Sequence, residues 1–116
     1  MKHDPNCIFC KIVAGQIPSR KVYEDDALFA FYDIAPWAPV HFLIIPKTHV
    51  ESLYEINFEA DQPLLGRMLA LAPKLMREQG VTNGFRTIVN NGVDGGQEVA
   101  HLHLHAIGGP RPWAKG

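Results

Sequence analysis

HLHLHAIGG, residues 101–109, sets a histidine at every second position and ends in two glycines. A period of two predicts a β-strand, because successive side chains of a strand point to opposite faces of the sheet. We therefore expect the apolar side chains of this stretch to fill the core and the histidines to face a groove. The histidines are His101, His103 and His105.

Three histidines on one strand face could hold a metal ion or carry out phosphorus chemistry. A strand rises about 3.3 Å per residue, so the backbones of His101 and His105 lie roughly 13 Å apart. Zinc needs its donor atoms at about 2.0–2.3 Å, and one ion held by all three histidines is therefore not expected. Imidazole titrates near ~6.5, so a row of histidines can supply a nucleophile, hydrogen-bond donors and a proton carrier at neutral pH. The remaining alternative is a polar strand face that is rich in histidine without a chemical role.

The loop before this strand favours the binding of an anion. Gly92, Gly95 and Gly96 allow the backbone to approach a ligand closely, and their N–H groups can surround a negative charge. Together with Asn90 and Gln97 they predict a small polar pocket at the ends of two neighbouring strands.

The bulk properties are those of one globular domain that spans residues 1–116. Hydrophobic residues make up 47% and charged residues 20%, which argues against a disordered or low-complexity chain. A net charge of -1 without a basic stripe disfavours a nucleic-acid partner. No apolar run approaches the ~20 residues that span a bilayer, and the N-terminus lacks the apolar core of a signal peptide. We therefore expect no membrane partner and a cytoplasmic location.

The rest of the chain predicts an α+β domain built on an antiparallel sheet. Apolar spacing and flanking turn residues favour a short helix within residues 4–18 and a main helix over 61–79. Pro73 is expected to kink the main helix or to leave one of its carbonyls unpaired. Two extended runs around a pair of aspartates favour a hairpin in 21–34. The further strands are expected over 41–46, 85–91 and 101–107.

Together these stretches resemble the histidine triad (HIT) family, whose motif is His-x-His-x-His. The resemblance is carried by NNGVDGGQEVAHLHLHAIGG at 90–109, CIFCKIVAGQIPSRKVYEDD at 7–26 and FYDIAPWAPVHFLIIPKTH at 31–49. Within the family the chain is most similar to the Hint branch, the purine nucleoside phosphoramidases. The resemblance implies a five-stranded antiparallel sheet with one main helix and a short N-terminal helix, assembled as a homodimer. It also implies hydrolysis of the phosphorus–nitrogen bond of a purine nucleotide.

The resemblance implies a role for each site residue. His103 would be the nucleophile that carries the nucleotidyl group until water releases AMP, and His105 would donate to a phosphate oxygen. His101 completes the catalytic set, and Asp33 would take the ribose hydroxyls. Glu98 stands where some members carry a serine that hands a proton to the leaving amine, so that step stays open. The remaining nucleotide-binding positions are Ile8, Phe9, Ile12, Phe31 and Ile34 around the purine, and His41, Asn90, Gly96 and Gln97, beside Glu98, around the phosphate.

Cys7 and Cys10 have the spacing with which two thiolates share one zinc ion at the start of a helix. A structural zinc needs two further ligands, and the resemblance implies that these are His49 and His101. Four protein ligands leave no open position for water, so such a zinc would be structural and not catalytic. Unligated thiols and a redox pair remain the alternatives for the two cysteines. No organic cofactor is expected.

Two other functions stay open at this point. One is dinucleoside polyphosphate hydrolysis within the same family, and the other is a regulatory partner protein that binds nucleotides. Core packing is likewise the alternative role for Phe9, Phe31 and Ile34. In Hint-like dimers the C-terminal segment reaches the partner's site, so we expect Trp113 or Arg111 to influence the choice of leaving group across the interface.

Overall fold

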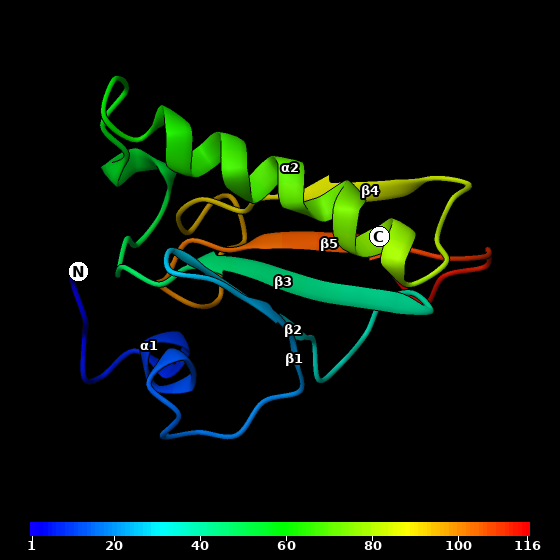
Figure 1. Cartoon of the computed structure of the whole chain (residues 1–116), viewed down its shortest axis with the longest axis horizontal. Helices are drawn as coiled ribbons and strands as arrows, with labels where there is room; N and C mark the ends of the chain where they lie inside the picture. Colours follow the sequence, from blue (N-terminus) through cyan, green and yellow to red (C-terminus); the bar gives the residue numbers. More distant parts are fainter.

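The computed structural model describes all residues 1–116 and contains a five-stranded antiparallel sheet with strand order β1-β2-β3-β5-β4 (Figure 1). The predicted fold class, the hairpin and both helices are confirmed, and the strand predicted over 85–91 ends early, at Ile88. None of the helices has the length and apolar character required to span a bilayer. The elements are α1 (Ile8–Val13), β1 (Lys21–Glu24), β2 (Leu28–Tyr32), β3 (Val40–Pro46), the 3-10 helix η1 (Leu53–Glu55), α2 (Gln62–Glu78), β4 (Phe85–Ile88) and β5 (Leu104–Gly108).

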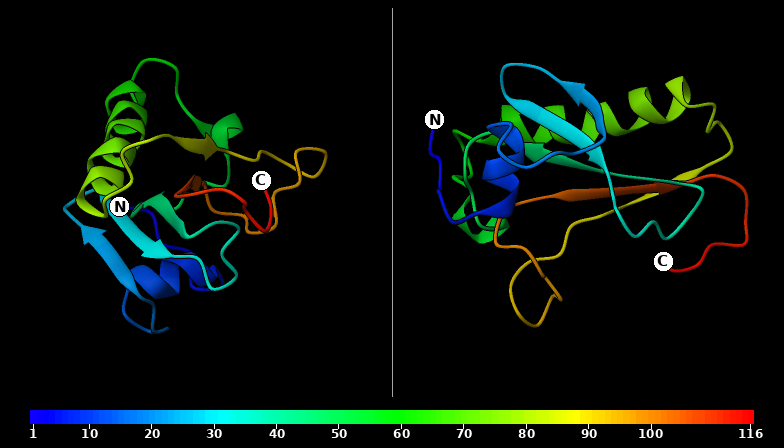
Figure 2. Two further views of the ribbon diagram at one scale, coloured as in Figure 1. Left: turned by 90° about the vertical axis from the view of Figure 1, so that its right-hand side faces the viewer. Right: turned by 90° about the horizontal axis from the view of Figure 1, so that it is seen from below.

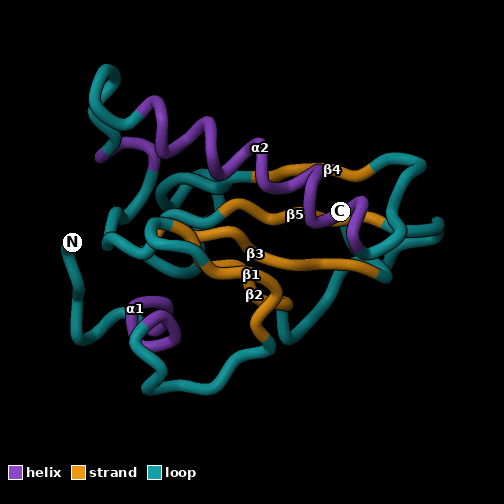
Figure 3. Tube along the Cα trace, viewed as in Figure 1, coloured by secondary structure: helices purple, strands orange, loops and turns teal.

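The sheet carries a helix on each face (Figure 2). α2 lies across one face, over β3 and β5, and α1 lies against the other face, beside β2 and β3 (Figure 3). In β3, Phe42 and Ile44 belong to the core on the α2 side, whereas Leu43 and Ile45 belong to the core on the α1 side. Burial on both faces explains why the part of this strand from Phe42 to Ile45 is apolar throughout and does not alternate.

The histidine stretch becomes a strand only at Leu104, so the prediction of a strand over 101–107 is wrong at its start. Ladder pairing with β3 begins where Leu104 meets Ile44, and before that point Leu102 donates its N–H to the Val50 carbonyl at 2.6 Å. The alternation of faces still holds, because the leucines join the core on the α2 side. All three histidines are buried, however, so they do not simply face an open groove.

α2 confirms the predicted main helix and runs through Pro73 without interruption. Proline lacks an N–H, so the Leu69 carbonyl receives no hydrogen bond from position 73, four residues further along the helix. The helix ends in a Schellman motif: Gly80 takes a φ of 81°, and Val81 donates its N–H to the Met76 carbonyl at 2.9 Å.

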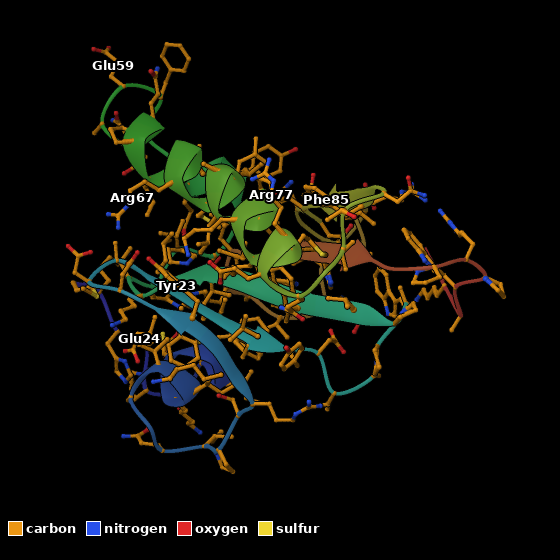
Figure 4. The ribbon with its side chains drawn as sticks, turned by 45° about the vertical axis from the view of Figure 1, so that its right-hand side comes forward. Tyr23, Glu24, Glu59, Arg67, Arg77 and Phe85 are labelled. Carbon is orange, nitrogen blue, oxygen red and sulfur yellow. The ribbon has the colours of Figure 1, made fainter.

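Asp25 holds the turn of the β1–β2 hairpin and joins it to α2. Its carboxylate accepts the N–H groups of Ala27 and Leu28 at 2.8 and 2.7 Å and the hydroxyl of Tyr23 at 2.7 Å. Arg67 extends from α2 towards the hairpin and pairs with the same carboxylate at 2.9 Å (Figure 4). Partial burial raises the pKa of Asp25, but these donors outweigh burial and hold the pKa at about 2.

The Asp25→Asn variant is expected to be less stable than the wild type by about 1 kcal/mol at pH 7, a value reduced for the partial exposure of the carboxylate. The folded pKa lies below the ordinary value of 3.8, so the ionised carboxylate stabilises the fold above about pH 4, and this contribution is lost as the pH falls towards 2. Denaturant unfolding of both proteins at pH 7, 4 and 2.5 measures the difference, with Asp94→Asn in an exposed loop as the control. A difference that does not change with pH would contradict the assignment.

Candidate active site

A cavity of about 530 Å³ holds two of the three histidines in its wall and is the candidate active site. A slightly larger cavity, of about 560 Å³, lies beside the end of α2 and the start of β4, but no histidine, cysteine or carboxylate lines it. It therefore offers no catalytic nucleophile or base of the predicted kind. The residues that line the first cavity are Phe9, Asp33, Ala35, Trp37, Leu43, Asn90, Gly95, Gly96, Glu98, Val99, His103, His105 and Lys115.

The cavity brings together seven of the predicted nucleotide-binding residues and leaves six outside its wall. The seven are Phe9, Asp33, Asn90, Gly96, Glu98, His103 and His105. Of the others, Ile8 and Ile34 are exposed on the surface, and Ile12 and Phe31 are buried in the core between α1 and the sheet. For Phe31 the alternative of core packing therefore agrees with the structure. The other two, His41 and Gln97, form hydrogen bonds with residues that line the cavity.

Gln97 holds the shape of the glycine-rich loop and does not line the cavity. Its Oε1 accepts the Gly92 N–H at 2.9 Å, and its Nε2 donates to the Val99 carbonyl at 2.9 Å. The loop is so tight that a Cβ on Gly95 would lie 2.3 Å from the Asn91 carbonyl oxygen. Only glycine fits there without moving the backbone.

His103 is buried, and one hydrogen bond sets the orientation of its ring. Its Nδ1 lies 2.7 Å from the backbone carbonyl of His101. A carbonyl only accepts, so Nδ1 carries the proton and Nε2 of the neutral ring keeps its lone pair. Phe9 packs against the same ring with the planes perpendicular and the centroids 5.3 Å apart. His103 thus has an unprotonated ring nitrogen of the kind that attacks an electrophile.

His105 takes the opposite tautomer. The backbone N–H of Trp37 donates to His41 Nδ1 at 3.1 Å, which leaves the His41 proton on Nε2. That Nε2–H donates to His105 Nδ1 at 2.9 Å, so the His105 proton is on Nε2. Burial lowers the pKa of both rings, to about 4 for His105, although Asp33, 3.7 Å from His41, opposes the shift. His105 is therefore a neutral hydrogen-bond donor at pH 7.

Trp37 and Lys115 also line the cavity, and neither was predicted from the sequence as a site residue. The Trp37 ring stacks on His105 with the centroids 4.8 Å apart and 18° between the planes. Trp37 lies in a proline-bounded turn between two predicted site residues, Asp33 and His41. This position in the sequence could have indicated that it belongs to the site. No local pattern around Lys115 indicates its position.

Four potential metal ligands from distant parts of the chain meet on the α1 side of the sheet. Cys7, Cys10, His49 and His101 are all buried, and their donor atoms lie within 4.8 Å of one another. His101 Nδ1 lies 3.3 Å from both Cys7 Sγ and His49 Nδ1, and Cys10 Sγ lies 3.4 Å from His49 Nδ1. A tetrahedral zinc ion with bonds of about 2.0–2.3 Å separates its donors by roughly 3.3–3.8 Å. The donor set therefore has the chemistry and the spacing that zinc requires.

The surroundings of these ligands agree with a metal site. His101 Nε2 donates to the Pro46 carbonyl at 2.8 Å, so its Nδ1 keeps a lone pair for an ion. The N–H groups of Cys10 and Asp4 donate to the sulfurs of Cys7 and Cys10 at 3.4 and 3.5 Å. Burial raises the pKa of the Cys10 thiol, and the hydrogen bond from Asp4 opposes this shift. The side chain of His101 therefore belongs to this cluster and does not line the cavity, although its carbonyl orients His103.

Comparisons with known proteins identify the family of the chain. The HIT domain family model matches residues 14–111. The chain is 51% identical over 105 residues to the protein HitA of Neisseria gonorrhoeae, covering 90% of this chain and 97% of that protein. It is 45% identical over 103 residues to the purine nucleoside phosphoramidase of Escherichia coli (strain K12), covering 88% of this chain and 86% of that protein.

Solved structures agree with the sequence matches. A HIT family hydrolase from Legionella pneumophila has a TM-score of 0.87 at 46% identity and covers 91% of this chain and 95% of its own. A histidine triad protein from Clostridium difficile has a TM-score of 0.89 at 45% identity and covers 95% of this chain and 96% of its own. The chain therefore belongs to the HIT domain family.

Proposed function

We propose that this protein is a hydrolase that cleaves the phosphorus–nitrogen bond of purine nucleoside 5′-phosphoramidates through a covalent bond to His103. The observation that carries the proposal is the pair of opposite tautomers in one cavity, a free Nε2 lone pair on His103 beside an Nε2–H on His105. One ring is suited to attack phosphorus and the other to stabilise the charge on its oxygens. The likeness to the phosphoramidase of Escherichia coli supports the same chemistry.

The reaction takes two displacements at phosphorus. In the first, Nε2 of His103 forms a bond to phosphorus, the phosphorus–nitrogen bond breaks, and the leaving amine takes a proton. This proton comes from solvent water and can be passed on by the carboxyl group of Glu98, which donates only while it is protonated. The neutral His105 ring only donates a hydrogen bond, because loss of its Nε2 proton would leave an imidazolate. In the second, a water oxygen bonds to phosphorus, the nitrogen–phosphorus bond returns its electron pair to His103, and the water proton restores the donor.

The nucleoside is proposed to lie between Phe9 and Asp33. Phe9 supplies an apolar surface next to His103, which suits a purine base. One oxygen of Asp33 accepts the Ala35 N–H at 2.8 Å, and the other is left for the ribose hydroxyls. The backbone of Gly95 and Gly96 lines the wall on the side of the glycine-rich loop. The N–H groups of Gly92 and Gly96 are already bonded within the loop, to Gln97 Oε1 and to the Val93 carbonyl, so the expected cradle of three glycine N–H groups is not formed.

Adenosine and guanosine phosphoramidates are expected to be hydrolysed with a kcat/KM at least about 100-fold above that of diadenosine polyphosphates, because the site has one nucleophile and one apolar wall for a single nucleoside. A steady-state panel with chromatographic detection of the released nucleoside monophosphate measures the ratio. A preference for the polyphosphates would assign the chain to the other reaction of the family. Tight nucleotide binding without turnover of any compound would favour a regulatory partner protein.

We also propose that Cys7, Cys10, His49 and His101 hold a structural zinc ion. The ion would tie α1 to the segment that leads into β5, so that Phe9 and His103 keep their contact. The homodimer stays a prediction, as does the influence of Trp113 or Arg111 on the leaving group.

A further inference from the structure

Lys115 holds the C-terminal segment against the candidate active site. Its backbone N–H donates to the Trp37 carbonyl at 3.1 Å, and its side chain lines the cavity of the catalytic histidines. The next residue, Gly116, accepts a hydrogen bond from the Arg86 guanidinium on β4 at 2.6 Å. The backbone around Lys115 is thus fixed to both the β2–β3 turn and the edge of the sheet.

Lys115 is the only lysine or arginine in the wall of the cavity. The wall also contains two carboxylates, Asp33 and Glu98. His105 does not balance the negative charges of these carboxylates, because its ring is neutral and its Nδ1 accepts a hydrogen bond from His41. A phosphate group that entered the cavity without Lys115 would meet two negative charges and no permanent positive charge.

Trp37 holds the Lys115 ammonium in place before a substrate arrives. The Lys115 Nζ lies 4.8 Å from the centroid of the Trp37 ring, a distance at which a cation is attracted to the face of an indole. The same ring stacks on His105. The ammonium is therefore kept near the ring that donates to the phosphate, and less side-chain freedom is lost on binding.

We propose that Lys115 is a substrate-binding residue whose ammonium contacts the phosphoryl oxygens, so that the cavity distinguishes phosphorylated from unphosphorylated nucleosides. The proposal rests on the proposed function in one respect, the placement of a phosphoryl group beside His105. It does not depend on hydrolysis. A charge-assisted contact of this kind corresponds to about a tenfold change in affinity.

Calorimetric titration of the full chain with AMP and with adenosine tests the proposal. The Lys115→Met variant is expected to bind AMP about tenfold more weakly and adenosine with less than a twofold change, because only AMP carries the phosphate. Lys115→Arg is expected to recover most of the AMP affinity, and Lys74→Met, on the exposed face of α2, to bind as the wild type does. Raising the salt concentration should weaken AMP binding more in the wild type than in Lys115→Met.

An unchanged AMP affinity in Lys115→Met, or an equal loss for AMP and adenosine, would overturn the role of Lys115. Thermal unfolding of each variant shows whether the fold is intact. If the wild type binds AMP through Lys115 but hydrolyses no phosphoramidate, the anion contact stands and the proposed function fails. If phosphoramidates are hydrolysed and Lys115→Met keeps its AMP affinity, the proposed function stands and the anion contact fails.

Discussion

The His103→Ala variant is expected to lose turnover of adenosine phosphoramidate by at least about a thousandfold while it still binds AMP, because the covalent step has no other nucleophile in the cavity. His105 cannot take over, since its Nδ1 accepts from His41 and its Nε2 carries a proton. AMP binding should persist, because Phe9, Asp33 and Lys115 remain in the wall. Single-turnover kinetics and calorimetry on the same preparation separate the two effects.

A second measurement follows the covalent intermediate itself. Rapidly quenched wild-type protein should gain the mass of one nucleotidyl group in intact-protein mass spectrometry, and His103→Ala should not. The His3→Ala variant removes an exposed histidine outside the cavity and serves as the matched control. Near-normal turnover in a folded His103→Ala protein would exclude the proposed mechanism.

Protein purified without added zinc is expected to contain about one equivalent of zinc, because four buried ligands with the spacing of a tetrahedral ion leave no open position. Removal of the metal should lower the Tm by at least about 10 °C, since a structural zinc contributes several kcal/mol to folding in a small domain. Elemental analysis and thermal unfolding before and after treatment with a chelator measure both quantities.

The Cys10→Ser variant should show the same loss of metal and of thermal stability, because the ligand at this position is completely buried. His3→Ala is again the control, since it removes a histidine outside the cluster. Less than a tenth of an equivalent of zinc in well-folded wild-type protein would exclude the metal site and leave Cys7 and Cys10 as buried thiols.

The sequence predicted the order of elements and the faces of the histidine stretch, but not where its strand begins. Alternation is a local property, and it assigns Leu102 and Leu104 to the core without reference to any other strand. The start of β5 depends instead on its pairing with β3, and this pairing begins where Leu104 meets Ile44. The pairing partner is distant in the sequence, so no pattern within 101–107 shows where the strand begins.

The candidate site was predictable where a residue type has a chemical reason to be there. Asp33, Asn90 and His103 belong to this group, and the structure places all three at the cavity. Ile34 was assigned to the purine site from the resemblance to the family, and its side chain lies in solvent because β2 has already ended at Tyr32. Lys115 could not be found, because its place depends on a backbone contact with Trp37 across the fold.

The hydrogen bond from Trp37 to His41 uses the backbone N–H of residue 37, so it does not depend on the side chain at this position. Every amino acid except proline supplies that N–H, so the proton arrangement of His41 and His105 places almost no restriction on which side chain stands at position 37. The indole ring has a separate role, because it stacks on His105 and lies against the Lys115 ammonium. Replacement of Trp37 by a residue other than proline should therefore keep the proton arrangement of the two histidines and remove only the contacts of the ring.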